Sequence, residues 1–202
     1  MLFRSNGIET LAGLEYKTTL EHVNLAGNQI YTIDPLRGQV TIKELELANN
    51  RISDVSTLAT LYGLHELKRL DLSHNKILST RGLKRFTKLK DLWLWDNSIS
   101  DLQELRGLTN LDHLSLSYNN VADVSDLSEL TNLTYLDLGQ NRITDVTPLA
   151  AMTKISYLLN LGDNLIRDVS PLKALADQTF RLILTGNPLI DRTCPIRNYC
   201  EL

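Results

Sequence analysis

One eleven-residue phrase recurs along nearly the whole chain and limits its fold more than any other feature of the sequence. The phrase is Leu-x-x-Leu-x-Leu-x-x-Asn-x-Ile, and its copies read LEHVNLAGNQI (20–30), IKELELANNRI (42–52), LKRLDLSHNKI (67–77), LKDLWLWDNSI (89–99), LDHLSLSYNNV (111–121) and LTYLDLGQNRI (133–143), with looser copies at 158–166 and 181–189. Successive copies place their asparagine 22 to 25 residues apart. Such a period is typical of a chain that stacks repeated units into a coil.

The alternation of side chains along a strand predicts where the leucines of the phrase lie. In Leu-x-Leu both leucines lie on the same side of an extended chain, and one short strand cannot bury them. Strands stacked about 4.8 Å apart form a parallel sheet above a continuous leucine ladder. The recurring asparagine sits where the strand turns a corner, so we expect its amide to bond backbone groups of neighbouring turns and to tolerate an unusual φ. The asparagines with this structural role are Asn28, Asn50, Asn75, Asn97, Asn119, Asn141, Asn164 and Asn187.

The segment after each asparagine predicts the opposite wall of the coil. Its apolar residues recur at gaps of three, as in Ile52, Val55 and Leu58. This spacing favours short 3₁₀ or irregular turns over long helices.

Two copies depart from the regular period. Three extra residues around LATLYGLHEL (58–67) predict a longer, helical turn on the opposite wall. One extra residue near ISYLLN (155–160) leaves Leu159 and Leu161 pointing inward only if a small bulge precedes them. In that frame Leu158 faces out.

These repeats resemble the leucine-rich repeat family, and the resemblance covers essentially the whole chain. The 22-residue period with "SDV" or "TDV" and then "SPL" or "TPL", as in LTNLTYLDLGQNRITDVTPL (130–149), is similar to the subclass of bacterial internalins and eukaryotic Sds22-type phosphatase regulators. The ending GNPLIDRTCPIRNYC is similar to the C-terminal caps of bacterial members. The resemblance implies an α/β fold, a right-handed solenoid with a concave parallel β-sheet and short 3₁₀ or irregular convex segments. We expect a single domain over 1–202: a truncated first repeat (1–19), eight full repeats (20–189) and a C-terminal cap (190–202).

Charge and hydropathy weigh against several functional classes. The net charge is −3 and the pI near 5.8, which argues against nucleic-acid binding, since that needs clustered Lys and Arg. The sequence contains no stretch of about 18 apolar residues, so it predicts no membrane span. The start of the chain lacks a basic segment followed by an apolar run, so the sequence predicts no signal peptide. A cytoplasmic location is expected of the chain as it stands, while the resemblance leaves a secreted or cell-surface bacterial parent open.

In this frame Trp93 and Trp95, the two tryptophans of the chain, point away from the leucine ladder. They alternate with Leu92 and Leu94 in LKDLWLWDNSIS (89–100). We expect nothing large from the same sheet to cover the indoles, because their neighbours on adjacent strands are small or polar. The middle outward row is Asn24, Glu46, Asp71, Trp93, Ser115, Asp137, Asn160 and Ile183.

Exposed aromatic residues of this kind match the composition of a protein-binding hot spot. The central outward rows hold more acids than bases, so we predict a protein partner that presents apolar or aromatic anchors and some basic groups. The predicted partner-binding residues are Trp93, Trp95, Tyr118, Tyr135, His113, Asp71, Asp91, Asp137, Glu46 and Arg69. Two other interpretations stay open: cross-strand packing without a partner, and a contact between two copies of a chain that we otherwise expect to be a monomer.

Catalytic and metal-binding groupings are weak in this sequence, and no cofactor is expected. A His–Asp pair on adjacent turns could orient an imidazole, but no nucleophile completes a triad. An open, shallow face offers no enclosed shell for a metal ion. The groups in question are His74 with Asp96, His113 with Asp91, and His22 with Glu44 and Glu46.

Both cysteines lie after the last repeat, in RTCPIRNYCEL. Cys194 and Cys200 could form a disulfide that pins the final turn and shields the end of the ladder. Free thiols and a metal site are the alternatives.

The sequence therefore predicts a protein-interaction module without catalytic activity. The internalin resemblance implies a surface or secreted interaction module. The alternative is an intracellular regulator of the Sds22 type that scaffolds a phosphatase or another enzyme on the same face.

Overall fold

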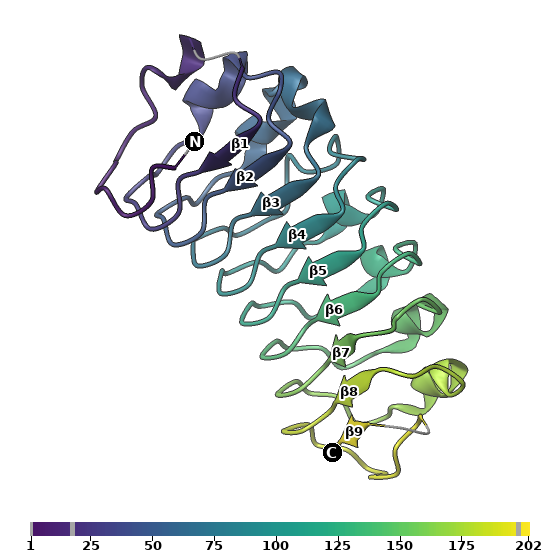
Figure 1. Ribbon diagram of the computed structural model, residues 1–202. Helices are drawn as coiled ribbons and strands as arrows, with labels where there is room; N and C mark the ends of the chain where they lie inside the picture. Colours follow the sequence, from purple (N-terminus) through teal and green to yellow (C-terminus); the bar gives the residue numbers. More distant parts are fainter. Residues whose placement is uncertain (1, 17–18, 197–198) are drawn as a thin grey trace.

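Short strands stack side by side into one parallel sheet in the computed structural model (Figure 1). The structure describes residues 2–16, 19–196 and 199–202. Within them the order of the strands in the sheet follows the order in the chain. The strands are β1 (His22–Asn24), β2 (Glu44–Glu46), β3 (Arg69–Asp71), β4 (Asp91–Trp93), β5 (His113–Ser115), β6 (Tyr135–Asp137), β7 (Leu158–Asn160), β8 (Arg181–Ile183) and β9 (Cys200–Glu201).

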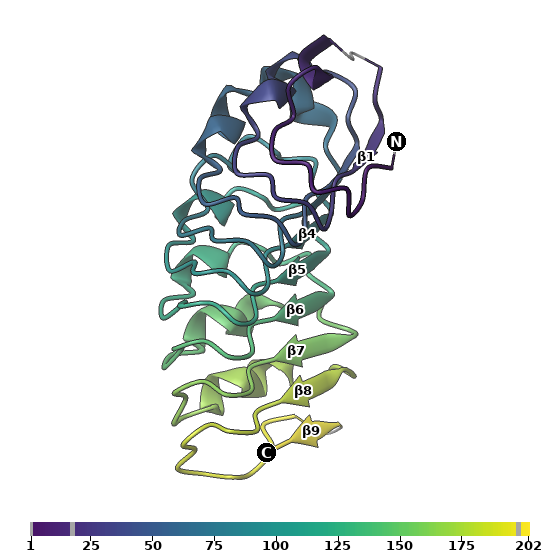
Figure 2. The same ribbon diagram turned by 90° about the vertical axis from the view of Figure 1, so that its left-hand side faces the viewer.

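Short 3₁₀ helices form the wall opposite the sheet, and the stack bends toward the strands (Figure 2). This confirms the convex turns predicted from apolar gaps of three. No helix among the described residues is long and apolar enough to cross a membrane. The helices are η1 (Leu14–Tyr16), η2 (Asp34–Gly38), η3 (Ser56–Thr60), η4 (Tyr62–Glu66), η5 (Gln103–Leu105), η6 (Ser125–Leu127), η7 (Thr147–Ala151) and η8 (Ser170–Leu175).

The leucine ladder forms the core between the two walls. Neighbouring strands pair without a register shift, so the central leucines of successive turns face one another. Each of them is 0% exposed. The row formed by the second leucine of each Leu-x-Leu is equally buried. The central row is Leu45, Leu70, Leu92, Leu114, Leu136, Leu159 and Leu182.

The recurring asparagines tie each turn to the one before it. Nδ2 of Asn119 donates to the carbonyls of Leu94 and Leu116, both at 3.0 Å, and Oδ1 accepts from the N–H of Ile99 at 2.8 Å. One side chain thus satisfies three backbone groups at a corner where no sheet partner reaches them. The same pattern holds at Asn50, Asn75, Asn97, Asn141, Asn164 and Asn187.

The unusual φ predicted at the asparagines belongs to the residue before each of them. The corner turns in the left-handed region one position earlier, which leaves the asparagine amide free to reach into the coil. The prediction was therefore right about the bonds and wrong about the strained position. The residues with positive φ at these corners are Gly27, Asn49, His74, Asp96, Tyr118, Gln140, Asp163 and Gly186.

The two departures from the period have separate solutions. The three extra residues are taken up by consecutive 3₁₀ helices, η3 and η4, as predicted. The single extra residue is absorbed just before β7. In the preceding turns the first strand residue and the residue before it both donate to one carbonyl, whereas here Ser156 and Tyr157, one position earlier, donate to the carbonyl of Thr134 at 3.1 Å. Leu158 accordingly aligns with Tyr135 on the outward face, and the leucine after it is fully buried.

The C-terminal segment extends the sheet by one strand. The N–H of Leu182 donates to the carbonyl of Tyr199 at 2.8 Å, and Arg181 pairs with Glu201 at 2.7 Å. Cys194 and Cys200 are free thiols that lie in contact. Burial, and then the contact with Cys194, raises the pKa of the Cys200 thiol to about 12. The disulfide stays a prediction for oxidising conditions.

Replacing Asn119 by alanine should lower the free energy of unfolding by about 2–4 kcal/mol, because buried backbone groups left without a partner cost about 1–3 kcal/mol each. Urea denaturation measures the change. Asn110→Ala is the matched control, since its exposed amide makes one bond to the Thr87 carbonyl, and it should lose less than about 0.5 kcal/mol. Equal losses in the two variants would contradict the structural role of the asparagine ladder.

The raised pKa of Cys200 predicts slow alkylation in the folded, reduced protein. Near pH 8 an ordinary thiol is substantially ionised, whereas a thiol with a pKa of about 12 is almost entirely protonated and unreactive. Iodoacetamide should therefore modify Cys200 at least about tenfold more slowly in folded than in urea-unfolded protein, as followed by peptide mass mapping. Comparable rates would refute the shift. The intact mass before reduction tests the disulfide separately, through the loss of two hydrogens.

Candidate functional site

Four aromatic side chains meet on the concave face, across β4 to β7. They form what we call the aromatic cluster: Trp93, His113, Tyr135 and Tyr157. The indole of Trp93 stacks on His113 at 6.3 Å between ring centroids and lies 5.8 Å from Tyr135. His113 in turn lies 5.9 Å from Tyr135 and 6.5 Å from Tyr157. These separations fall in the range of favourable aromatic pairs.

Trp95 has a separate aromatic neighbour. The ring of His74 meets Trp95 edge-on, with 3.8 Å between centroids, and His74 is held by a hydrogen bond to Asp96. The expectation that nothing large covers the indoles was therefore wrong. Both tryptophans lie on the outward face as predicted, but each is half-buried rather than exposed, because an imidazole from a neighbouring turn packs on it.

Asp91 fixes the position of the imidazole that stacks on Trp93. Its Oδ1 lies 2.7 Å from Nδ1 of His113, and its Oδ2 lies 3.4 Å from Nε of Arg69. The three side chains come from β3, β4 and β5, so the pairs run across the strands. Three of the predicted binding residues thus hold one another and orient the aromatic cluster.

The predicted acids of the middle row have local structural roles. Oδ1 of Asp71 accepts from the N–H of Ser73 at 2.9 Å, and Oδ1 of Asp137 accepts from the N–H of Gly139 at 3.1 Å. In both cases the carboxylate accepts from the N–H two residues later in the chain, which stabilises the turn at the end of the strand. Glu46 lies on β2, two strands from Trp93, and accepts a hydrogen bond from Asn24 on β1. The structure therefore does not bring Glu46 to the cluster.

A hollow of about 170 Å³ opens beside the cluster, over β6 to β8. It contains two predicted residues, Tyr118 and Asp137, while sequence reasoning missed the others. The sequence does contain a signal for this hollow: Gly139 and Gly162 fall in consecutive repeats, in an outward row that elsewhere holds alanine, serine, threonine or Trp95. Burial raises the pKa of the Asp137 carboxyl, and this effect outweighs the hydrogen bonds from Gly139, Ser117 and Asn160, which lower the pKa. The polar side chains that line the hollow include Tyr118, Asp137, Gln140, Asn160, Asp163 and Thr185.

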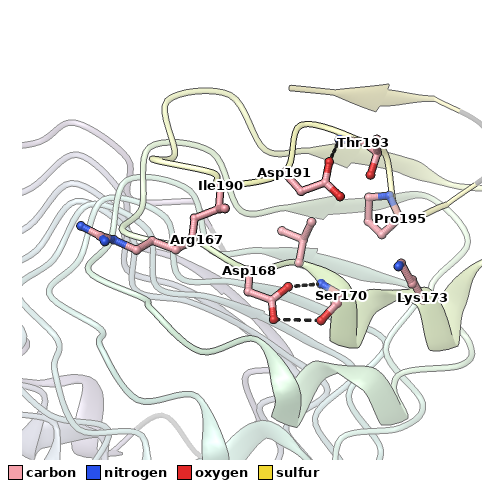
Figure 3. A pocket seen from close by; sticks show the side chains of 9 residues that line it. Arg167, Asp168, Ser170, Lys173, Ile190, Asp191, Thr193 and Pro195 are labelled. Carbon is pink, nitrogen blue, oxygen red and sulfur yellow. Dashed lines mark hydrogen bonds between the residues drawn. The ribbon is translucent and has the colours of Figure 1, made fainter.

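A second cavity, of about 220 Å³, lies at the C-terminal end away from the sheet (Figure 3). Asp168 accepts from the N–H and the hydroxyl of Ser170, and Asp191 accepts from the N–H of Thr193, all at 2.8 Å. These bonds lower the pKa of both carboxyls. Each acid is thus engaged by its own loop, and Lys173 adds a positive charge beside both.

The His, Asp and Glu groups considered for catalysis or metal binding form simple pairs in the structure. His22 lies 2.9 Å from Glu44, and Glu46 bonds elsewhere. Among the residues that the structure describes, no three His, Cys, Asp or Glu side chains are placed to hold a metal ion. The two His–Asp pairs are formed, and in each of them the imidazole packs on a tryptophan.

The raised pKa of Asp137 predicts a gain in stability when its charge is removed. The folded protein binds this proton more tightly than the unfolded chain, whose aspartate pKa is about 3.9. The contribution of Asp137 is therefore most favourable below that pH and is lost as the pH rises through the folded-state pKa. Asp137→Asn should raise the free energy of unfolding near pH 7, and the gain should vanish below about pH 4.

Urea denaturation at the two pH values measures this difference. The matched control is Asp145→Asn, because hydrogen bonds from Thr147 lower the pKa of Asp145. Its contribution has the opposite sign, so this variant should lose stability near neutral pH. A loss of stability in Asp137→Asn at neutral pH would show that its bonds outweigh the burial of its charge.

Comparisons with known proteins agree with this geometry. A family model described as "Leucine Rich repeats (2 copies)" matches residues 40–85, 65–107, 87–129, 109–151 and 131–174, and one described as "Leucine Rich repeat" matches 16–30. No curated protein sequence matches significantly.

Several solved structures are similar to this one. Internalin C2 of Listeria monocytogenes is 36% identical with a TM-score of 0.83, over 90% of this chain and 79% of that one. Internalin F of the same organism is 33% identical with a TM-score of 0.73, over 94% of this chain and 61% of that one. A leucine-rich repeat protein of Leptospira interrogans, 24% identical with a TM-score of 0.70 over 94% of this chain and 55% of that one, shares the fold. The chain therefore belongs to the leucine-rich repeat family and is of the internalin-like type.

Proposed function

We propose that this protein binds a protein partner on its concave face, with the aromatic cluster and Trp95 at the centre of the contact. Leucine-rich repeat proteins of internalin type are protein-interaction modules, and an extended concave surface suits that use. The observation that carries the proposal is the packing of Trp93 on His113 and Tyr135 at the middle of the sheet.

Preorganisation is what makes this cluster suitable for binding. An aromatic side chain that is already held loses little conformational freedom on contact with a partner. Asp91 holds His113, His113 stacks on Trp93, and Tyr135 closes the other side. Half-buried tryptophan and tyrosine beside an ordered charge pair have the composition of residues that dominate binding energies.

Binding fits the face better than catalysis. The imidazoles of both His–Asp pairs are engaged with indoles, His74 with Trp95 and His113 with Trp93. A regulator of the Sds22 type would use the same face, but the similarity to two internalins favours the internalin-like alternative.

Removing both indoles should weaken partner binding at least tenfold, about 1.4 kcal/mol. A partner is first captured on immobilised wild-type protein and identified by mass spectrometry. Its Kd is then measured for wild type, Trp93→Ala, Trp95→Ala and the double variant. Because the indoles pack on His74 and His113, circular dichroism and urea denaturation must show that each variant is folded at the assay temperature.

Tyr31→Ala is the control, since Tyr31 is 56% exposed and lies outside the sheet. It should change the Kd by less than about twofold, which is the size of a surface effect outside the contact. A folded double variant that binds as wild type does would refute the proposal. Sedimentation velocity tests the remaining alternative, because a wild-type dimer that dissociates without the indoles would place a second copy on this face.

A further inference from the structure

The hollow beside the aromatic cluster exists because two turns carry glycine where other turns carry a side chain. A Cβ at Gly139 would lie 2.7 Å from Nδ2 of Asn160, closer than such contacts occur. A Cβ at Gly162 would lie 3.2 Å from both Oδ1 of Asn160 and Cγ2 of Ile183. The two glycines therefore let Asn160 lie across the floor and leave about 170 Å³ open above the sheet.

Two carboxylates line this space, and the hydrogen bonds that they accept come from neutral groups. Asp137 accepts from the N–H of Gly139 at 3.1 Å and from Nδ2 of Asn160 at 2.8 Å. Asp163 accepts from Nε2 of Gln140 at 2.6 Å. Within the described residues, no Lys, Arg or His side chain forms an ion pair with either carboxylate.

Other carboxylates on the same face do have a basic partner on a neighbouring turn. Glu46 and Asp71 share the neutral bonding pattern, but they lie outside this hollow. The hollow thus combines an open volume with uncompensated negative charge. The carboxylates with a basic partner are Glu44 with His22, Asp91 with Arg69 and His113, Asp96 with His74, and Glu201 with Arg181.

The size of the hollow sets the size of its occupant. Pockets for whole small molecules span roughly 300–1,000 Å³, so this volume fits a single side chain. Tyr118 stands at the rim with 56% of its surface exposed, and an aromatic face attracts a cation. A guanidinium carries five donors in a plane and stacks on aromatic rings, while an ammonium is a compact point charge.

We infer that the hollow receives one basic side chain of the partner, an arginine in preference to a lysine, between Asp137, Asp163 and Tyr118. The inference rests on the proposed function, because it names a feature of the partner that the concave face binds. Burial of the Asp137 carboxylate, which raises its pKa, agrees with a charge that lacks its counter-ion until the partner arrives.

A titration with a small probe tests the site without a partner protein. The probes are N-acetyl-arginine methylamide, the corresponding lysine compound, and the citrulline compound, which has the shape of arginine without its charge. Backbone amide spectra of the ¹⁵N-labelled protein report on Gly139 and Gly162. Both amides should shift saturably with arginine, more weakly with lysine and not with citrulline. Added salt should weaken the arginine effect, since the charges are partly exposed.

Variants of the two acids assign the effect to the hollow. Asp163→Asn keeps an acceptor for Gln140, and asparagine tolerates the φ of 52° at this position. Asp137→Asn keeps an acceptor for the N–H of Gly139. Each should weaken the arginine probe about tenfold or more, as expected for a lost bond to a charged group. The matched control is Asp123→Asn on the opposite wall, where Asp123 accepts from the N–H of Ser125 at 2.8 Å; it changes the net charge equally and should leave the titration unchanged.

Three results would overturn the inference: equal shifts with citrulline, shifts that survive both acid variants, or an equal loss in the Asp123 control. The titration also separates this inference from the proposed function. If the arginine probe does not bind while the tryptophan variants still lose the partner, the hollow is not a subsite and the concave face still binds. If the probe binds and the tryptophan variants keep the partner, the proposed contact is wrong and the arginine site stands by itself.

Discussion

The bonds of the asparagine side chain at each corner hold the stack together. At Asn97, Nδ2 donates to the carbonyls of Leu72 and Leu94, and Oδ1 accepts from the N–H of Ile77. Unpaired, these backbone groups would face an apolar core, where each is unfavourable. Because one amide reaches both its own turn and the preceding one, it sets the distance and register between them. The parallel sheet, its buried leucine rows and its outward rows all follow from that register.

The sequence predicts whatever depends on this register alone. The outward direction of Trp93 and Trp95, the burial of Leu159 and the consecutive 3₁₀ helices at the long repeat all follow from counting along the chain. Contacts between side chains of different turns do not follow from counting. The imidazoles on the two indoles depend on rotamers and on the volumes of neighbours. Tyr157 joins the cluster from the position just before β7, where the extra residue is absorbed.

Charge on the concave face shows the same division between counting and geometry. A tally of acids and bases predicts a face that is mildly acidic throughout. The structure instead pairs Asp91 with Arg69 and His113, and leaves Asp137 and Asp163 with neutral partners in a hollow. A charge that is partly buried without a counter-ion lowers the stability of the fold around it, as is common at functional sites. The placement of the charge, rather than its total, therefore distinguishes one part of the face from another.

Each turn contacts chiefly its immediate neighbours, and the aromatic cluster spans four consecutive turns from β4 to β7. A whole turn inserted or deleted between β1 and β3 would leave the order of those four turns unchanged. A turn inserted between β5 and β6 would move His113 and Tyr135 apart by one further strand spacing and dismantle the cluster. A change of repeat number on the N-terminal side of the coil therefore leaves the aromatic cluster intact, whereas one among the central turns takes it apart.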